Sequence, residues 1–82
     1  MNLLVLTPDQ EVFNGQIQSV KVPGINGQFE ILKDHAPLVS ALGKGEVRIL
    51  GEKGEKTLFQ IENGFIEVLQ NEVSILVQGV EK

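Results

Sequence analysis

The chain has 82 residues, with eleven acidic and seven basic side chains, one histidine and no cysteine. Its formal net charge of −4 argues against nucleic acid and anionic lipid surfaces as partners, because both would repel an acidic protein. The lack of cysteine excludes disulfides and thiolate metal sites, and no apolar stretch approaches the roughly 20 residues that span a bilayer, so we expect no direct membrane insertion.

Apolar residues that recur with a period of two predict β-strands along most of the chain. Residues 3–6 form an apolar run near the start, and residues 65–69 form a second run that is apolar in both phases. We expect both faces of these two strands to be covered. Alternation typical of half-buried strands is found at residues 20–22, 46–49, 58–61 and 73–77.

Turn residues separate these runs at short intervals. Asn14-Gly15 predicts a tight hairpin between residues 11–13 and 16–22, and Glu52-Lys53-Gly54-Glu55 predicts the polar tip of another. His35-Ala36-Pro37-Leu38, preceded by Asp34 as a cap, is the one candidate for a helical turn. Many short strands with frequent turns predict an all-β sandwich or barrel in a single domain, residues 1–82.

The residue inventory offers little for catalysis. A nucleophilic mechanism needs a nucleophile and a base, and the only histidine, His35, stands next to Asp34. Adjacent residues of an extended segment rarely point at one another, so His35 is interpreted as anchoring a turn or a partner surface. The carboxylate pairs lack the Gly-punctuated acidic loop of a calcium site, and the Gly-containing turns lack the spacing of a phosphate-binding loop. We therefore expect no enzyme, no metal and no cofactor.

On its residues alone, the segment 23–42 fits either an ordinary loop followed by a core strand or a surface that accepts another chain closely. Its motifs are Pro23-Gly24, Asn26-Gly27, Phe29 to Leu32, His35-Ala36-Pro37-Leu38 and Ser40-Ala41-Leu42, followed by Gly45-Glu46-Val47-Arg48-Ile49. Elsewhere the chain has an opening strand ending in Thr7-Pro8, then Val12-Phe13-Asn14-Gly15, Asn63-Gly64-Phe65-Ile66-Glu67-Val68 and a last strand at residues 72–77. Together and in this order, these elements resemble the epsilon family of ATP synthases, called delta in mitochondria.

Three features depart from the family pattern. Lys33-Asp34 replaces the usual Pro-Gly before His-Ala-Pro, and Gln28 stands where many relatives have an acidic residue. The α-helical hairpin that follows the β-sandwich in most members is not present in this sequence. We therefore expect neither the inhibitory arm nor the ATP site that some bacterial members carry on it.

The resemblance implies a sandwich of about ten strands at the foot of the central stalk of a proton- or sodium-translocating F-type ATP synthase. It implies a non-catalytic rotor subunit, monomeric within a hetero-oligomeric complex, that binds gamma and the c ring and couples ion flow to ATP synthesis. Its expected location is peripheral, on the cytoplasmic face of the bacterial inner membrane. The residues expected in the loop that faces the c ring are Asn26, Gly27, Gln28 and Phe29. Those expected toward gamma are His35, Ala36, Pro37, Leu38 and Ser40, with Thr7 and Glu62 at the margin and Leu38 as the anchor.

One alternative assigns the chain to the lipoyl or biotinyl carrier domains, which are also small acidic β-sandwiches. Such domains present a lysine at a hairpin tip, and Lys53 occupies this kind of position. Their lysine is flanked as Asp-Lys-Ala or Met-Lys-Met, whereas Lys53 lies between Glu52 and Gly54. An adduct on Lys53, detected by intact mass, would distinguish this alternative from a rotor subunit.

Overall fold

The computed structural model describes residues 1–81, which form eight β-strands and no helix. The strands are β1 (Asn2–Leu6), β2 (Glu11–Gly24), β3 (Gly27–Leu32), β4 (Leu38–Leu42), β5 (Gly45–Gly51), β6 (Lys56–Ile61), β7 (Asn63–Leu69) and β8 (Glu72–Gln78). The all-β prediction is confirmed, with eight strands where about ten were expected. Within the described residues, no helix has the length and apolar character needed to cross a membrane.

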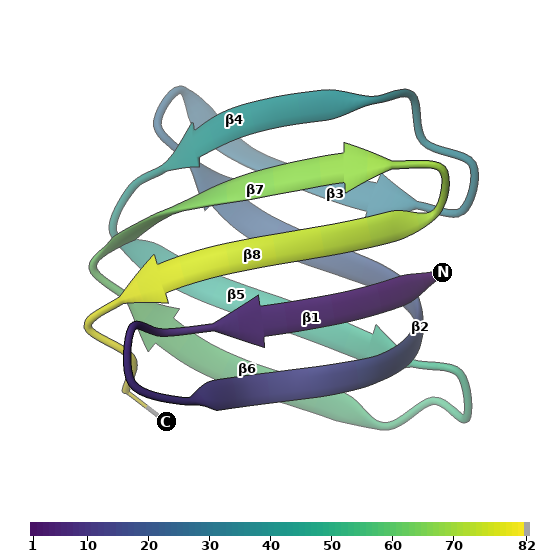
Figure 1. The fold of residues 1–82 in the computed structure, drawn as a ribbon, viewed down its shortest axis with the longest axis horizontal. Helices are drawn as coiled ribbons and strands as arrows, with labels where there is room; N and C mark the ends of the chain where they lie inside the picture. Colours follow the sequence, from purple (N-terminus) through teal and green to yellow (C-terminus); the bar gives the residue numbers. More distant parts are fainter. Residues whose placement is uncertain (82) are drawn as a thin grey trace.

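The strands form two layers, with β4, β7, β8 and β1 in front of β3, β5 and β6 in Figure 1. β1 runs parallel to β8 and antiparallel to the first part of β2. The later part of β2 pairs with β3 on one side and β5 on the other. A straight 14-residue strand would be roughly 46 Å long, yet the longest extent of the molecule is 27 Å. β2 therefore bends, and its backbone belongs to both layers.

The predicted hairpin at Asn14-Gly15 is wrong. Both residues lie inside β2, where Asn14 is opposite Leu4 and Gly15 is opposite Leu3. A tight two-residue turn of the expected type needs positive φ at both central positions, and neither residue has it. The partner strand β1 holds this stretch extended, so tertiary pairing overrides the local turn signal.

Two-residue turns occur instead at Ile25-Asn26, which joins β2 to β3, and at Gln70-Asn71, which joins β7 to β8. Gln70 and Asn71 have φ of 50° and 64°, the left-handed pair that such a turn requires. The helical turn expected at residues 35–38 does not form, because β4 begins at Leu38 and residues 35–37 are irregular. The tip predicted at residues 52–55 is confirmed between β5 and β6.

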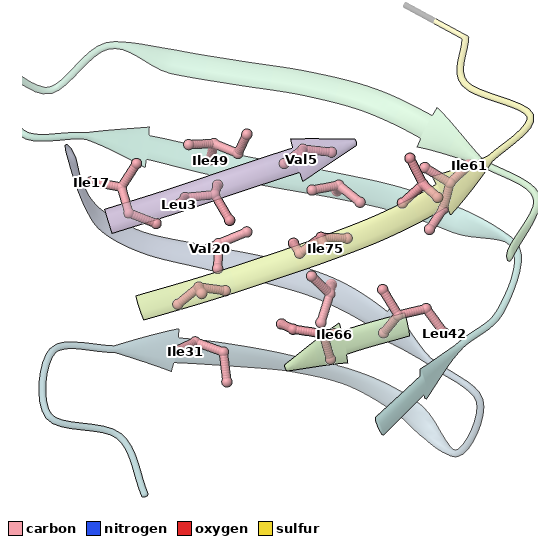
Figure 2. Packing of buried hydrophobic residues seen from close by; sticks show 14 of the residues in the cluster. Leu3, Val5, Ile17, Val20, Ile31, Leu42, Ile49, Ile61, Ile66 and Ile75 are labelled. Carbon is pink, nitrogen blue, oxygen red and sulfur yellow. The ribbon is translucent and has the colours of Figure 1, made fainter. Parts of the chain in front are cut away.

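The core lies between the two layers, where every strand contributes inward-facing apolar side chains (Figure 2). Leu3, Ile66 and Ile75 from one layer and Ile31 from the other are fully buried. Close packing of this kind gives a stiff interior that resists deformation. The expectation of cover on both faces is wrong for residues 65–69 in this chain by itself, since Phe65 and Leu69 are more than half exposed, whereas Leu4 and Leu6 of residues 3–6 are half-buried.

Candidate docking surfaces

The most distinctive surface is the outer side of the layer formed by β4, β7, β8 and β1. Strand register places four residues side by side in one row across it: Ala41, Phe65, Leu76 and Leu6. The next row contains Val39, Glu67, Ser74 and Leu4. We call the six apolar members of these rows, Leu4, Leu6, Val39, Ala41, Phe65 and Leu76, the apolar face.

The exposure of this face is large for apolar side chains. Val39 is 71% exposed, Phe65 58% and Leu76 53%. Two adjoining grooves cross the face, one lined by Leu6, Phe65 and Leu76 and the other also by Leu4 and Val39. Single exposed apolar residues are normal, but contiguous ones indicate a binding surface. This layer therefore carries a candidate binding surface.

The expected c-ring loop lies at one end of the sandwich, at the β2–β3 turn. Asn26, Gly27 and Gln28 are exposed, whereas Phe29 is half-buried and packs against the core. A Cβ on Gly24 would come within 2.7 Å of the Phe29 ring, so only glycine lets the strand pass this close. The Phe29 ring thus lies next to the close approach of Gly24, with Ile25 and Asn26 forming the exposed turn and Gly27 and Gln28 forming the exposed start of β3.

The loop that contains His35 lies at the opposite end, next to the β7–β8 turn (Figure 1). Asp34, with φ of 65°, donates its backbone N–H to Asn71 Oδ1 at 2.7 Å, and Asn71 Nδ2 donates to Asp34 Oδ1 at 2.9 Å. The Asn71 carbonyl also accepts from the backbone N–H of Asn2 at 2.9 Å. Asn71 therefore ties together three segments: the loop, the β7–β8 turn and the start of β1.

The residues expected toward gamma do not form one continuous patch. Ala36 and Pro37 are exposed beside the half-buried His35, whereas Thr7 and Glu62 lie at the other end of the layer. Thr7 holds the β1–β2 turn, since its Oγ1 accepts from the backbone N–H groups of the turn at 3.2 and 3.1 Å.

Leu38 and Ser40 lie on β4 and face the interior. Leu38 is half-buried and packs against the core, opposite the buried Val68. Ser40 is opposite the buried Ile66, and its hydroxyl donates to the Ala41 carbonyl at 3.3 Å. Neither side chain is a free anchor, because the β4 register turns Val39 and Ala41 outward instead.

The polar groups of the loop support a structural role for His35. The Nδ1 atom of its ring lies 2.7 Å from the Ala36 carbonyl oxygen, while the neighbouring Asp34 carboxylate binds the Asn71 amide. The ring and the carboxylate thus have separate partners. Within residues 1–81, no three His, Cys, Asp or Glu side chains gather into a group that could hold a metal ion.

The sequence alone does not predict the apolar face. Its signal was present in the two runs that are apolar in both phases, residues 3–6 and 65–69. Periodicity shows that both sides of such a strand need cover. It does not distinguish cover by the same chain from cover by another.

The comparisons with known proteins agree with one another. A family described as "ATP synthase, Delta/Epsilon chain, beta-sandwich domain" matches residues 1–82. The chain is 47% identical over 77 residues to the ATP synthase epsilon chain of Chlorobaculum tepidum, a match that covers 93% of this chain and 86% of that one. It is 46% identical over 77 residues, with the same coverage, to the epsilon chain of Chlorobium limicola.

Solved structures show the same fold at lower identity. A chain in the cryo-EM structure of the Euglena gracilis mitochondrial ATP synthase superposes with a TM-score of 0.90 at 21% identity. A chain in the central stalk and c-ring structure of the Tetrahymena thermophila mitochondrial ATP synthase gives 0.84 at 17% identity. The matches cover 96% and 99% of this chain, and 51% and 65% of those chains.

Proposed function

Because the chain belongs to the ATP synthase delta/epsilon family, whose β-sandwich domain it matches throughout, we propose that it is a non-catalytic rotor subunit of an F-type ATP synthase. In this role it binds gamma and the c ring and couples proton or sodium flow to ATP synthesis. It is then peripheral to the cytoplasmic face of a bacterial inner membrane, held there by the complex. The family match carries this proposal, and it argues against the lipoyl or biotinyl carrier.

We assign gamma to the apolar face. Phe65, Leu76 and Val39 gain most from being covered, because they are the most exposed apolar side chains of this face. Of the residues expected toward gamma, His35, Ala36 and Pro37 precede β4 at one end of this face. At the other end Thr7 lines a groove of the face, and Glu62 directly precedes Asn63 of the same groove. Leu38 and Ser40 lie beneath it and support β4. The proposed contact is therefore the face together with its two borders.

The c ring is assigned to the end of the sandwich that carries Asn26, Gly27 and Gln28, with Phe29 as their support. The outer face of a sheet and the ends of its strands are directed to different sides of the domain. One small domain can therefore contact two large partners at once, which a subunit joining gamma to the ring must do. Gln28 would meet the ring through hydrogen bonds rather than through charge.

The fold suits the transmission of torque between these two surfaces. β2 contributes backbone to both layers, and its last residue, Gly24, pairs with Leu42 at the end of β4. A force on the apolar face is therefore carried through continuous strands and a close-packed core to the turn after Gly24. Sliding of one layer over the other would break these pairings.

A pull-down tests the proposal. The tagged chain is expressed in its source organism, membranes are solubilised in a mild detergent, and bound proteins are identified by mass. We expect gamma, the c subunit and the catalytic subunits in the bound fraction. If an independent activity assay shows that the synthase stays intact and the tagged chain recovers none of its subunits, the proposal is refuted.

A further inference from the structure

The outer side of the other layer carries a polar groove of opposite character to the apolar face. It lies beside the β2–β3 turn, and its charged lining residues are Lys21, Lys44, Glu46 and Arg48. Three cations and one carboxylate give the lining a net charge of +2, in a chain whose net charge is −4. The net charge of the whole chain is negative and argues against anionic partners, but the lining of this groove is positive.

Strand register forces two of these cations together. Lys21 on β2 is directly opposite Arg48 on β5, and like charges in this arrangement are destabilising in a sheet. Glu30 on β3 opposes Lys21 from the other side. The other cross-strand neighbour of Arg48 is the apolar Leu58. Across the strands, Arg48 thus has a cation on one side and an apolar residue on the other, while Glu46, two residues earlier in β5, lines the same groove.

Lys44, the third cation, is positioned by backbone contacts of the residues before and after it. Gly43, before Lys44, donates its N–H to the Pro23 carbonyl at 2.8 Å. Gly45, after it, has φ of 156°, and a Cβ there would lie 2.8 Å from Cβ of Pro23. The β4–β5 loop is therefore held against Pro23, which places the backbone of Lys44 beside the groove and leaves its side chain exposed.

We propose that this groove binds a phosphate-bearing anion. The planar Arg48 guanidinium can hold two phosphate oxygens at once, and Lys21 and Lys44 add point charges on either side. Glu46 in the lining and Glu30 opposite Lys21 offset two of the three cations, so binding depends mainly on Arg48, whose planar fork suits phosphate oxygens. The group can come from a soluble phosphate compound or from a phospholipid headgroup. Gly27 and Gln28, which are assigned above to the c ring, also line this groove. The inference therefore concerns the free chain, and its test uses the chain without synthase partners.

The test uses the 82-residue chain and inorganic pyrophosphate, followed by amide chemical shifts at low ionic strength, where charges are screened least. We expect saturable shifts at Gly45, Arg48 and their neighbours. Arg48→Gln should weaken binding roughly tenfold or more, as expected for loss of a charged hydrogen bond. Lys53→Gln removes the same charge at the exposed β5–β6 tip and should leave the affinity within about twofold of the wild type.

The proposal is overturned if the wild-type chain shows no saturable shift, or if both variants lose affinity equally, which would indicate only a general charge effect. Co-sedimentation with phosphatidylglycerol vesicles, against phosphatidylcholine vesicles as control, distinguishes the two sources. Vesicle binding that pyrophosphate competes away and Arg48→Gln abolishes assigns the headgroup. Pyrophosphate binding without vesicle binding assigns a soluble phosphate.

Discussion

Truncation of Phe65 gives the sharpest prediction about the apolar face. The side chain is 58% exposed, and a phenylalanine buries about 150–250 Å² when fully covered. Roughly 90–145 Å² is therefore left for a partner to cover, worth about 2–4 kcal/mol at ~25 cal/mol per Å². Part of this is lost in ordering the interface. We therefore expect Phe65→Ala to cost about 2 kcal/mol of gamma binding, a Kd roughly 30-fold higher.

The assay is a titration of purified gamma with the fluorescently labelled chain. Leu58→Ala is the matched control, because Leu58 is also an exposed strand residue, 46% exposed, but lies on β6 in the other layer. Its Kd should stay within about twofold of the wild type, since single exposed apolar residues outside an interface contribute little. Both variants should unfold within about 1 kcal/mol of the wild type, since neither side chain is buried.

Equal Kd values for Phe65→Ala and the wild type would refute the assignment of gamma to the apolar face. Equal weakening by Phe65→Ala and Leu58→Ala would refute it as well, because the effect would then not belong to this layer. A loss confined to Phe65→Ala would support it.

Three further changes test the fold and its ends. Ile75→Ala, at a fully buried position, should lower the free energy of unfolding by about 2–5 kcal/mol, seen as a lower urea midpoint at unchanged slope. Asn71→Ala and Asn71→Gly both lose the side-chain hydrogen bonds to Asp34, but only glycine tolerates the φ of 64° at this position. In thermal melts the alanine variant should therefore be less stable than the glycine variant by about 1 kcal/mol. Equal melting temperatures would contradict the role of backbone strain. Gly24→Ala places a Cβ against the Phe29 ring and should displace the β2–β3 turn, seen as amide shifts at residues 25–28 and weaker binding to isolated c ring; unchanged spectra would contradict the close approach.

The sequence predicted the inward side of the sandwich well. Val20, Val22, Val73, Ile75 and Val77 are all buried, as their alternation indicated. Burial on one face follows from a period of two, because successive side chains of a strand point to opposite sides. This local rule holds whatever the strand order, so it can be applied without knowing the topology.

Long-range pairing explains what the sequence did not predict. Asn14-Gly15 is a strong local turn signal, but β1 pairs along it and keeps it extended. The same pairing makes β2 continue through 14 residues where two strands were expected. Which distant strand pairs with a segment cannot be predicted from the residues of that segment.

The candidate site shows the same limit. The motif around His35 led to residues 35–38, yet the β4 register turns Leu38 inward and Val39 outward. A slip of one residue exchanges the two faces of a strand, so motif matching finds the segment without finding its exposed side. The cluster of Phe65, Leu76 and Leu6 depends on three strands meeting in one register, which only the structure provides.

Site-specific photo-crosslinking in the assembled synthase tests the central claim most directly. A crosslinker at Val39 reports on the apolar face, one at Gln28 reports on the β2–β3 turn, and one at Leu58 serves as the control. We expect products with gamma from Val39, products with the c subunit from Gln28, and neither from Leu58. Intact synthase that gives no gamma product from Val39 and no c product from Gln28 would contradict the central claim.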